Sequence, residues 1–347
     1  MAGKALIAMS GGVDSSVAAM LVKNMGYDCI GCTMRLFDKE KDTPSADIAD
    51  AKSVAESLSM PFFVLDLREE FRKNVIDKFV GSYLSGVTPN PCVECNKCMK
   101  FGILFERAAA LGCERVATGH YARTEKQNGR YLLKKAADPT KDQSYVLYNL
   151  TQEQLEVALF PLGGMTKSEA RERAEESRFV NAAKHDSQDI CFVPDGNYAA
   201  LLGRITGKPE EGGDFVLADG RVIGHHKGIS HYTIGQHKGL GIISEEPLYV
   251  AKISPSDRVI TLCKNSELFG REAHVEGLNW IAGDPPGGSF ECSVKIRYRH
   301  REQPATVKIR DDGTADIRFD NPERAITPGQ SAVFYDGDTV LGGGIIV

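Results

Sequence analysis

The sequence has little that would mark it for a membrane, for export or for a general attraction to nucleic acid. No stretch approaches the roughly 18 apolar residues that a membrane helix needs, and residues 1–4 lead into a strand-like apolar run rather than a cleavable signal. The 47 acidic residues outnumber the 42 basic ones, which gives a net charge of -5. We therefore expect a cytoplasmic protein without a membrane partner, in which any nucleic-acid surface is a local cluster.

The chain also lacks the pattern of a small disulfide-bonded domain. Its nine cysteines are an odd number within 347 residues, whereas disulfide scaffolds belong to short secreted chains. The cysteines therefore favour metal or redox chemistry over structural cross-links. A hydrophobic content of 42% in a chain of this length predicts two or three domains.

Up to about residue 120, short apolar runs alternate with helical patterns. The expected strands cover 5–9, 29–34, 62–65 and 115–118, and the expected helices cover 13–25, 48–58, 71–83 and 101–111. This order predicts an α/β fold, with a parallel sheet covered by helices on both faces. Ligands of such sheets bind beyond the carboxyl ends of the strands, so a site is expected in the loop after the first strand.

From about residue 205 glycine and proline become frequent and the apolar runs shorten, which indicates an all-β region. The expected strands there cover 248–253, 259–263, 293–299, 305–309, 315–319 and 331–335. A break near Gly270 divides this region. We therefore predict a catalytic domain over 1–204, a small middle domain over 205–270 and a β-barrel-like C-terminal domain over 271–347.

The first strand leads into Ser-Gly-Gly-Val-Asp-Ser-Ser at residues 10–16, where a helix begins. Free N–H groups at a helix N-terminus suit phosphate, glycines let the backbone approach it, and Asp14 can hold Mg²⁺. No Walker-type G-x-x-x-x-G-K-[ST] motif occurs, and the alternative is an ordinary turn of small residues. We predict an ATP site with Mg²⁺, in which the nucleotide contacts are Ala8, Met9, Ser10, Gly11, Gly12, Val13, Asp14 and Ser15.

Two sets of motifs carry a family resemblance. The loop at 10–16 resembles that of the pyrophosphate-loop ATPases, which cleave ATP to AMP and pyrophosphate and adenylate a carbonyl oxygen. Residues 88–101, 119–121, 141–145 and 186–192 resemble, in that order, the tRNA-specific 2-thiouridylases. This resemblance covers nearly the whole chain. It implies ATP-dependent 2-thiolation of the wobble uridine of the tRNAs for Lys, Glu and Gln, with a partner protein that donates persulfide or sulfide.

By this resemblance, Cys95 is the nucleophile and Cys191 carries a persulfide, and a transient disulfide between them resets the cycle. Thiolates and persulfides are suitable sulfur nucleophiles. Residue 92 departs from the commoner family pattern, which has an aspartate proposed as an acid/base group, because this chain has Cys92. We hypothesise that Cys92, Cys95 and Cys191 hold a [4Fe–4S] cluster with one iron open to sulfide. Cys98 is a weaker candidate ligand.

The remaining cysteine and histidine patterns favour structural roles. Cys29 and Cys32 fall in a predicted buried strand, where residues three apart face opposite sides, so we interpret them as core residues. Four of the eight histidines lie within 224–241. That stretch lacks a clear ligand geometry, which makes a zinc site the weaker interpretation.

The resemblance also implies contacts to the nucleotide and to tRNA. Met34 is expected to pack against adenine, or simply to fill the core, and Gly119 to contact the nucleotide through its backbone. The expected tRNA contacts, some bordering the flipped-out base, are Asn90, Pro91, Cys92, His120, Lys141, Asp142, Gln143, Arg297, Tyr298 and Gln330. Basic residues spaced by two over 295–301 would share one face of a strand, and we favour an RNA-backbone contact over a solvated face.

Two other functions account for parts of the sequence. A pyrophosphate-loop ligase acting on a small metabolite would need the loop at 10–16 but not the basic residues over 295–301. An iron–sulfur electron carrier or a non-catalytic RNA-binding module would not need the phosphate loop. The main prediction is therefore a tRNA sulfurtransferase.

Overall fold

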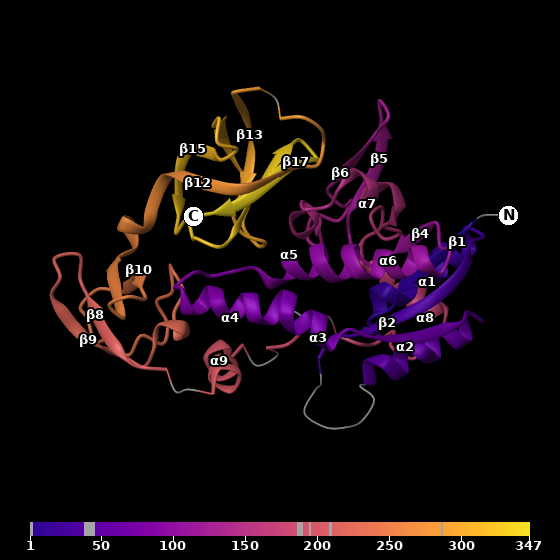
Figure 1. Cartoon of the computed structure of the whole chain (residues 1–347), viewed down its shortest axis with the longest axis horizontal. Coiled ribbons are helices and arrows are strands. Elements are labelled where there is room, and N and C mark those ends of the chain that lie inside the picture. The colour runs from indigo at the N-terminus through magenta and orange to yellow at the C-terminus, as the bar shows by residue number, and fades with distance from the viewer. Residues whose placement is uncertain (1–2, 38–45, 186–189, 194–195, 208–209, 286) are drawn as a thin grey trace.

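The computed structural model describes residues 3–37, 46–185, 190–193, 196–207, 210–285 and 287–347. These residues form three sheets (Figure 1). A five-stranded sheet lies in the N-terminal part, a four-stranded sheet follows, and an eight-stranded sheet includes the C-terminus. Within these ranges, no helix combines the length and the apolar character that crossing a bilayer requires.

The predicted parallel sheet is present. Its order is β3–β2–β1–β4–β7, and all neighbouring strands are parallel. The strands are β1 (Lys4–Ala8), β2 (Asp28–Arg35), β3 (Phe62–Asp66), β4 (Arg115–Ala117) and β7 (Ala158–Leu159). The central strand β1 is buried on both faces, which explains why its sequence is a continuous apolar run.

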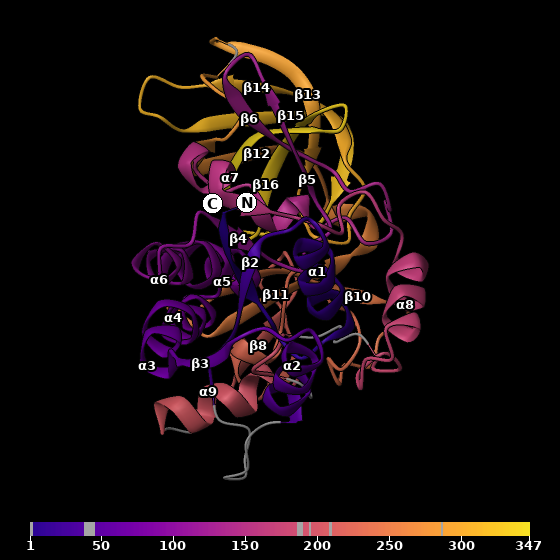
Figure 2. The ribbon, with the colours of Figure 1, turned by 90° about the vertical axis from the view of Figure 1, so that its right-hand side faces the viewer.

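Helices cover both faces of this sheet, as Figure 2 shows. Three helices pack their apolar side chains into one cluster with one face: α1 (Val13–Asn24), α2 (Ala46–Ser57) and α8 (Lys167–Glu176). The other face packs against α6 (Leu104–Ala110). The other helical segments of this part are α3 (Arg68–Phe71), η1 (Arg72–Ile76), α4 (Asp77–Leu84), α5 (Pro91–Cys95), η2 (Asn96–Ile103), η3 (Ser144–Leu147) and α7 (Gln152–Val157). The α/β prediction is confirmed.

Cys29 and Cys32 lie in β2 and point to opposite faces of the sheet. Cys29 belongs to the cluster beneath α1, whereas Cys32 belongs to the cluster beneath α6. Burial raises the pKa of Cys29 to about 11 and that of Cys32 to about 12. Both thiols are therefore protonated core groups, and their interpretation as structural cysteines is confirmed.

The middle sheet has the order β10–β11–β8–β9. Its elements are α9 (Tyr198–Thr206), β8 (Gly213–Val216), β9 (Val222–His226), η4 (Ile229–His231), β10 (Leu248–Ser254) and β11 (Val259–Lys264). His226 is buried here, with Nε2 3.0 Å from the Arg258 carbonyl oxygen and Nδ1 accepting from the Gly228 N–H at 3.1 Å. Both ring nitrogens are thus occupied within the protein, which agrees with a structural histidine rather than a zinc ligand.

The C-terminal strands form a closed antiparallel barrel, because β12 pairs with both β15 and β17. After the short turn η5 (Asn265–Leu268), the strands are β12 (Phe269–Trp280), β13 (Ser289–Lys295), β14 (Gln303–Ile309), β15 (Ala315–Arg324), β16 (Ser331–Asp336) and β17 (Thr339–Ile346). The strand predicted over 293–299 is present but begins and ends earlier, as β13. It ends at Lys295, and a turn follows in which the His300 N–H donates to the Arg297 carbonyl oxygen at 3.1 Å.

The barrel and the N-terminal part share a hydrophobic core. A hairpin of β5 (Arg123–Gln127) and β6 (Arg130–Lys134) extends the barrel sheet through the pair Thr339–Lys134. Tyr145 and Tyr148 from the N-terminal part pack in one cluster with Val333 and Tyr335 of β16. The Tyr145 hydroxyl also donates to the Ser331 carbonyl oxygen at 2.8 Å. The barrel is therefore fixed against the parallel-sheet body.

Candidate functional site

The predicted phosphate loop connects β1 to the N-terminus of α1. Gly11 has φ +76, and a Cβ on it would lie 2.1 Å from the carbonyl oxygen of Asp47. A Cβ on Gly119, at the end of β4, would lie 2.8 Å from the backbone nitrogen of Ser15. Only glycine lets the phosphate loop, the start of α2 and the segment after β4 approach one another so closely. The loop therefore presents backbone N–H groups in a compact cradle at the carboxyl end of the sheet.

Asp14 is held from two sides within the loop. The Lys167 ammonium donates to its two carboxylate oxygens at 2.8 and 2.9 Å, and the Tyr121 hydroxyl donates to Oδ1 at 2.8 Å. A magnesium ion bound with phosphates typically takes only one or two protein carboxylates. Asp14 supplies one such carboxylate, and the Lys167 ammonium places a positive charge beside it.

A second lysine, Lys184, binds the backbone of the phosphate loop. Lys184 donates to the Gly11 carbonyl oxygen at 3.1 Å and to the carboxylates of Asp47 and Asp50 at 2.7 and 2.6 Å. The Asn181 amide donates to the same carbonyl and to the Ser16 hydroxyl oxygen at 3.0 and 2.9 Å. Neither Lys167 nor Lys184 was predicted from the sequence, because no local motif links them to a loop more than 150 positions away.

The phosphate loop opens into a cleft of about 1260 Å³. This cleft runs from the end of β1 to the turn after β13 in the barrel. Of the predicted site residues, those that line it are Ser10, Gly12, Val13, Asp14, Met34, Lys141, Asp142, Gln143, Cys191 and Tyr298. The structure thus brings predicted nucleotide, cysteine and tRNA residues to one cavity.

The cysteine segment is helical throughout. Asn90 caps α5 by accepting from the Cys92 N–H at 3.1 Å, and Pro91 occupies the first turn, where a missing N–H is tolerated. The helix continues without a break into the π-helical η2. The prediction of a helix only from residue 101 was therefore too late, although the Asn-Pro pair was a usable start signal.

Cys95 lies against the segment that carries Cys191. It packs in one cluster with Phe192 and Val193, whereas Cys191 itself and Cys92 keep solvent contact. Even these accessible thiols are deeply surrounded by protein, and desolvation raises the pKa of Cys191 to about 12 and that of Cys92 above its ordinary value. Burial raises the pKa of Cys95 to about 11. All three sulfurs are free thiols in this structure.

The three cysteines do not form a ready metal site. Across the described ranges, no three His, Cys, Asp or Glu side chains gather in an arrangement that could hold a metal ion. The described residues therefore give no support to the hypothesised [4Fe–4S] cluster. Cys98 packs at the edge of the cluster around Cys95. Residues 186–189 of the second cysteine motif lie outside the described residues.

Several predicted tRNA contacts are engaged inside the protein. His120 is buried, the Arg297 guanidinium donates to the carbonyl oxygens of Arg324 and Ala325, and the Gln330 amide donates to the Thr88 carbonyl oxygen at 2.8 Å. The predicted alternating face of basic residues is absent, because β13 ends before Arg297. Lys295 at the end of β13, together with Arg299 and Arg301 after it, nevertheless lines the cleft.

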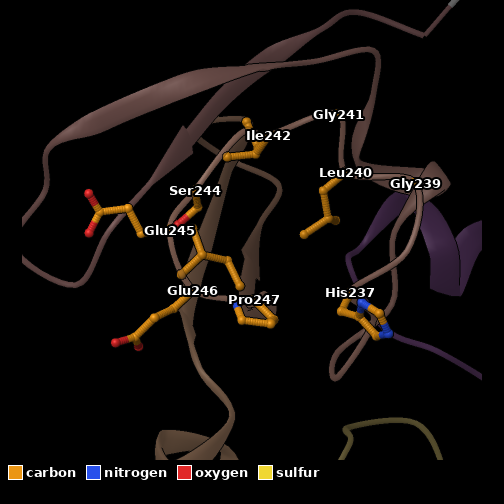
Figure 3. A pocket seen from close by; sticks show the side chains of 10 residues that line it. His237, Gly239, Leu240, Gly241, Ile242, Ser244, Glu245, Glu246 and Pro247 are labelled. Carbon is orange, nitrogen blue, oxygen red and sulfur yellow. The ribbon is translucent and has the colours of Figure 1, made fainter.

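A smaller pocket of about 380 Å³ lies in the middle domain, lined by residues of the loop over 237–248. Figure 3 shows Leu240 and His237 facing it, while the carboxylates of Glu245 and Glu246 point away. Its lining holds no cysteine and no phosphate-loop residue. We therefore place the site in the larger cleft.

Comparisons with known proteins agree with this organisation. Residues 3–195 match the family model of the tRNA methyl transferase HUP domain, residues 202–264 its PRC-barrel domain, and residues 271–346 the aminomethyltransferase beta-barrel domain. The chain is 48% identical over 355 residues to the tRNA-specific 2-thiouridylase MnmA of Geotalea uraniireducens (strain Rf4), covering 99% of this chain and 94% of that protein. It is 47% identical over 353 residues to the enzyme of the same name from Clostridioides difficile (strain 630), covering 99% and 98%. The chain therefore belongs to the tRNA-specific 2-thiouridylase family.

Proposed function

We propose that this chain is a tRNA-uridine 2-sulfurtransferase that uses ATP to replace the 2-oxygen of a uridine in tRNA by sulfur. The observation that carries the proposal is the shared cleft, because the phosphate loop and Cys191 line the same cavity. Cys95 is buried in one hydrophobic cluster with Phe192, the residue next to Cys191. An activating nucleotide and a sulfur carrier must both reach one base. Lys141, Lys295, Arg299 and Arg301 line this cleft and supply local positive charge for RNA on an acidic chain.

The first step makes the uridine oxygen a leaving group. The oxygen attacks the α-phosphorus of ATP, pyrophosphate departs, and the base carries AMP on its 2-oxygen. The N–H groups at the start of α1 bind the phosphates, and the Lys167 ammonium beside Asp14 adds positive charge at the same loop. Asp14 would hold Mg²⁺ together with the phosphates, and that ion supplies further neutralisation of their charge.

The second step delivers sulfur. The terminal sulfur of a Cys191 persulfide attacks carbon 2 of the base and the bond to the AMP oxygen breaks. The Cys95 thiolate then attacks the Cys191 sulfur, which leaves one sulfur on the base and a disulfide between the two cysteines. A thiol reductant returns both to thiols, and a donor protein reloads Cys191. Cys95 shares a hydrophobic cluster with Phe192, the residue after Cys191, which supports this pairing. The acceptors proposed are the wobble uridines of the tRNAs for Lys, Glu and Gln.

Mass analysis of nucleosides from tRNA incubated with ATP, a persulfide donor and the enzyme tests the proposal. Wild type should produce 2-thiouridine, whereas Cys95→Ala and Cys191→Ala should not, and Cys292→Ala in the barrel serves as the cysteine control. Cys92→Ala should retain activity if the two-cysteine cycle operates, and loss of activity in that variant would favour a three-cysteine site. A methylated or unchanged base would refute sulfur transfer. Pyrophosphate release without tRNA would favour a small-metabolite ligase.

A further inference from the structure

The segment before α5 is fastened to the turn between β15 and β16 of the barrel. The Gln330 amide donates to the Thr88 carbonyl oxygen at 2.8 Å, and the Thr88 N–H donates to the Pro328 carbonyl oxygen at 3.1 Å. Between these two bonds, a Cβ on Gly329 would lie 2.3 Å from Cγ1 of Val87, so only glycine allows the two backbones to approach. The barrel thus holds both polar groups of one peptide residue just before the cysteines.

The anchored carbonyl is two residues from the cap of the helix. Pro89 and Pro91 flank Asn90, and each proline fixes its own φ and restricts the residue before it. Asn90 is the residue that caps α5. A shift at Thr88 is therefore passed to the start of the helix, because the chain between them has little freedom to absorb it.

The next barrel residue supports the far end of the same helix. The Ser331 carbonyl oxygen accepts from the Tyr145 hydroxyl at 2.8 Å. The carbonyl of Val146, which follows Tyr145 in η3, accepts from the buried Asn96 amide at 3.0 Å. Asn96 directly follows Cys95, the last residue of α5. Two consecutive barrel residues therefore support α5, one directly at its start and the other through η3 at its end.

Gln330 does not act from within the cleft. Among the described residues that line the cleft, neither Gln330 nor Thr88 occurs. Residues 87–90 form neither helix nor strand, so their place depends on partners outside the segment. The position of Gln330 thus indicates an effect through α5, although its sequence motif suggested a contact with tRNA.

We propose that Gln330 is a positioning residue for sulfur transfer, which fixes the Thr88 carbonyl and thereby the helix that carries Cys95, and does not itself bind tRNA. The proposal rests on the function proposed above, in which Cys95 attacks the Cys191 sulfur. Such an attack requires the two sulfurs to be aligned, and a small displacement of a reacting group lowers the rate strongly.

Kinetics separate positioning from a tRNA contact. Gln330→Met keeps the length of the side chain and removes its donor. With ATP, a persulfide donor and tRNA, it should lower kcat for 2-thiouridine formation about tenfold. The dissociation constant for tRNA, measured by fluorescence anisotropy without ATP, should not change. Gln330→Lys restores a donor of similar reach and should recover most of kcat. Weaker tRNA binding with unchanged kcat in Gln330→Met would show a direct contact and overturn the proposal.

A second measurement needs no substrate. Hydrogen exchange of the backbone amides over 86–95 is followed by peptide masses in the full chain. Loss of the hydrogen bond to Thr88 should speed this exchange about fivefold in Gln330→Met. Gln303→Met, the same change at the start of β14, is the matched control and should leave both exchange and kcat unchanged. Thermal unfolding shows whether each variant is folded under the assay conditions.

The outcomes distinguish this proposal from the function on which it rests. Unchanged exchange over 86–95 in folded Gln330→Met overturns the anchoring, whatever the activity. An equal loss of kcat in Gln303→Met, or no recovery in folded Gln330→Lys, also overturns the proposal, because the effect would then not depend on the bond to Thr88. The function proposed above fails separately, if wild type makes no 2-thiouridine, since exchange is measured without substrates.

Discussion

Lys167 and Asp14 form an ion pair whose strength can be measured directly. The two side chains retain 12% and 31% of their exposure, and both carboxylate oxygens accept from the ammonium. A hydrogen bond to a charged group contributes about 1.5–3 kcal/mol, and partial exposure of Asp14 screens some of that. We expect a coupling free energy of about 1–2 kcal/mol, much more than an exposed pair provides.

A double-mutant cycle in urea with Lys167→Met, Asp14→Asn and the double variant gives this coupling. The matched control is the Lys52–Glu56 pair, with an N–O distance of 3.7 Å and both side chains more than 60% exposed. Its cycle with Lys52→Met and Glu56→Gln should give less than about 0.5 kcal/mol. Equal coupling in the two cycles would refute the conclusion that the loop carboxylate depends on Lys167.

Three further predictions concern backbone geometry and pH. Gly11→Ala should destabilise the protein by about 3 kcal/mol and abolish ATP binding, because the new methyl group meets the Asp47 carbonyl at φ +76; calorimetric titration with wild-type affinity would contradict this. Gly329→Ala should reduce tRNA thiolation but preserve ATP binding, since its Cβ would lie 2.3 Å from Val87 Cγ1 in the loop before the cysteine helix; equal loss of both activities would count against it. Burial holds the pKa of His120 below its ordinary value in the folded protein. Its contribution to the free energy of unfolding is therefore present above the pKa of the unfolded state and is lost as pH falls below about 6.5, by up to about 1.4 kcal/mol per pH unit. In urea unfolding, His120→Gln should make the free energy of unfolding depend less on pH, and an unchanged dependence would contradict a buried, neutral His120.

The sequence predicted the parts of the site that are built from consecutive residues. The loop at 10–16 follows a buried strand and starts a helix, so its place at the carboxyl edge of the sheet follows from local pattern alone. Lys167 and Lys184 reach the same loop from other segments, and their charges carry no local signal of that destination. Long-range packing decides such partners.

Two wrong boundary predictions, the one after β13 and the one at the start of the cysteine helix, also have a physical origin. The basic residues spaced by two over 295–301 have the spacing of one face of a strand. In the structure the chain turns after Lys295, and the Arg297 guanidinium points inward and donates to two carbonyl oxygens. Alternation records only which residues are polar, not which polar groups find partners inside. The late start assigned to the cysteine helix came from following apolar periodicity and passing over the cap at Asn90.

The hairpin β5–β6, paired with β17 and sharing a core with β16, has a consequence for dissecting this protein. A chain that ended before β12 would expose Tyr145 and Tyr148 to solvent. It would also leave β6 as an exposed edge strand, which is a template for aggregation. The N-terminal body should therefore be poorly soluble alone. Mutations on the face of the barrel that packs against Tyr145 and Tyr148 should therefore also reduce the stability of the nucleotide-binding half.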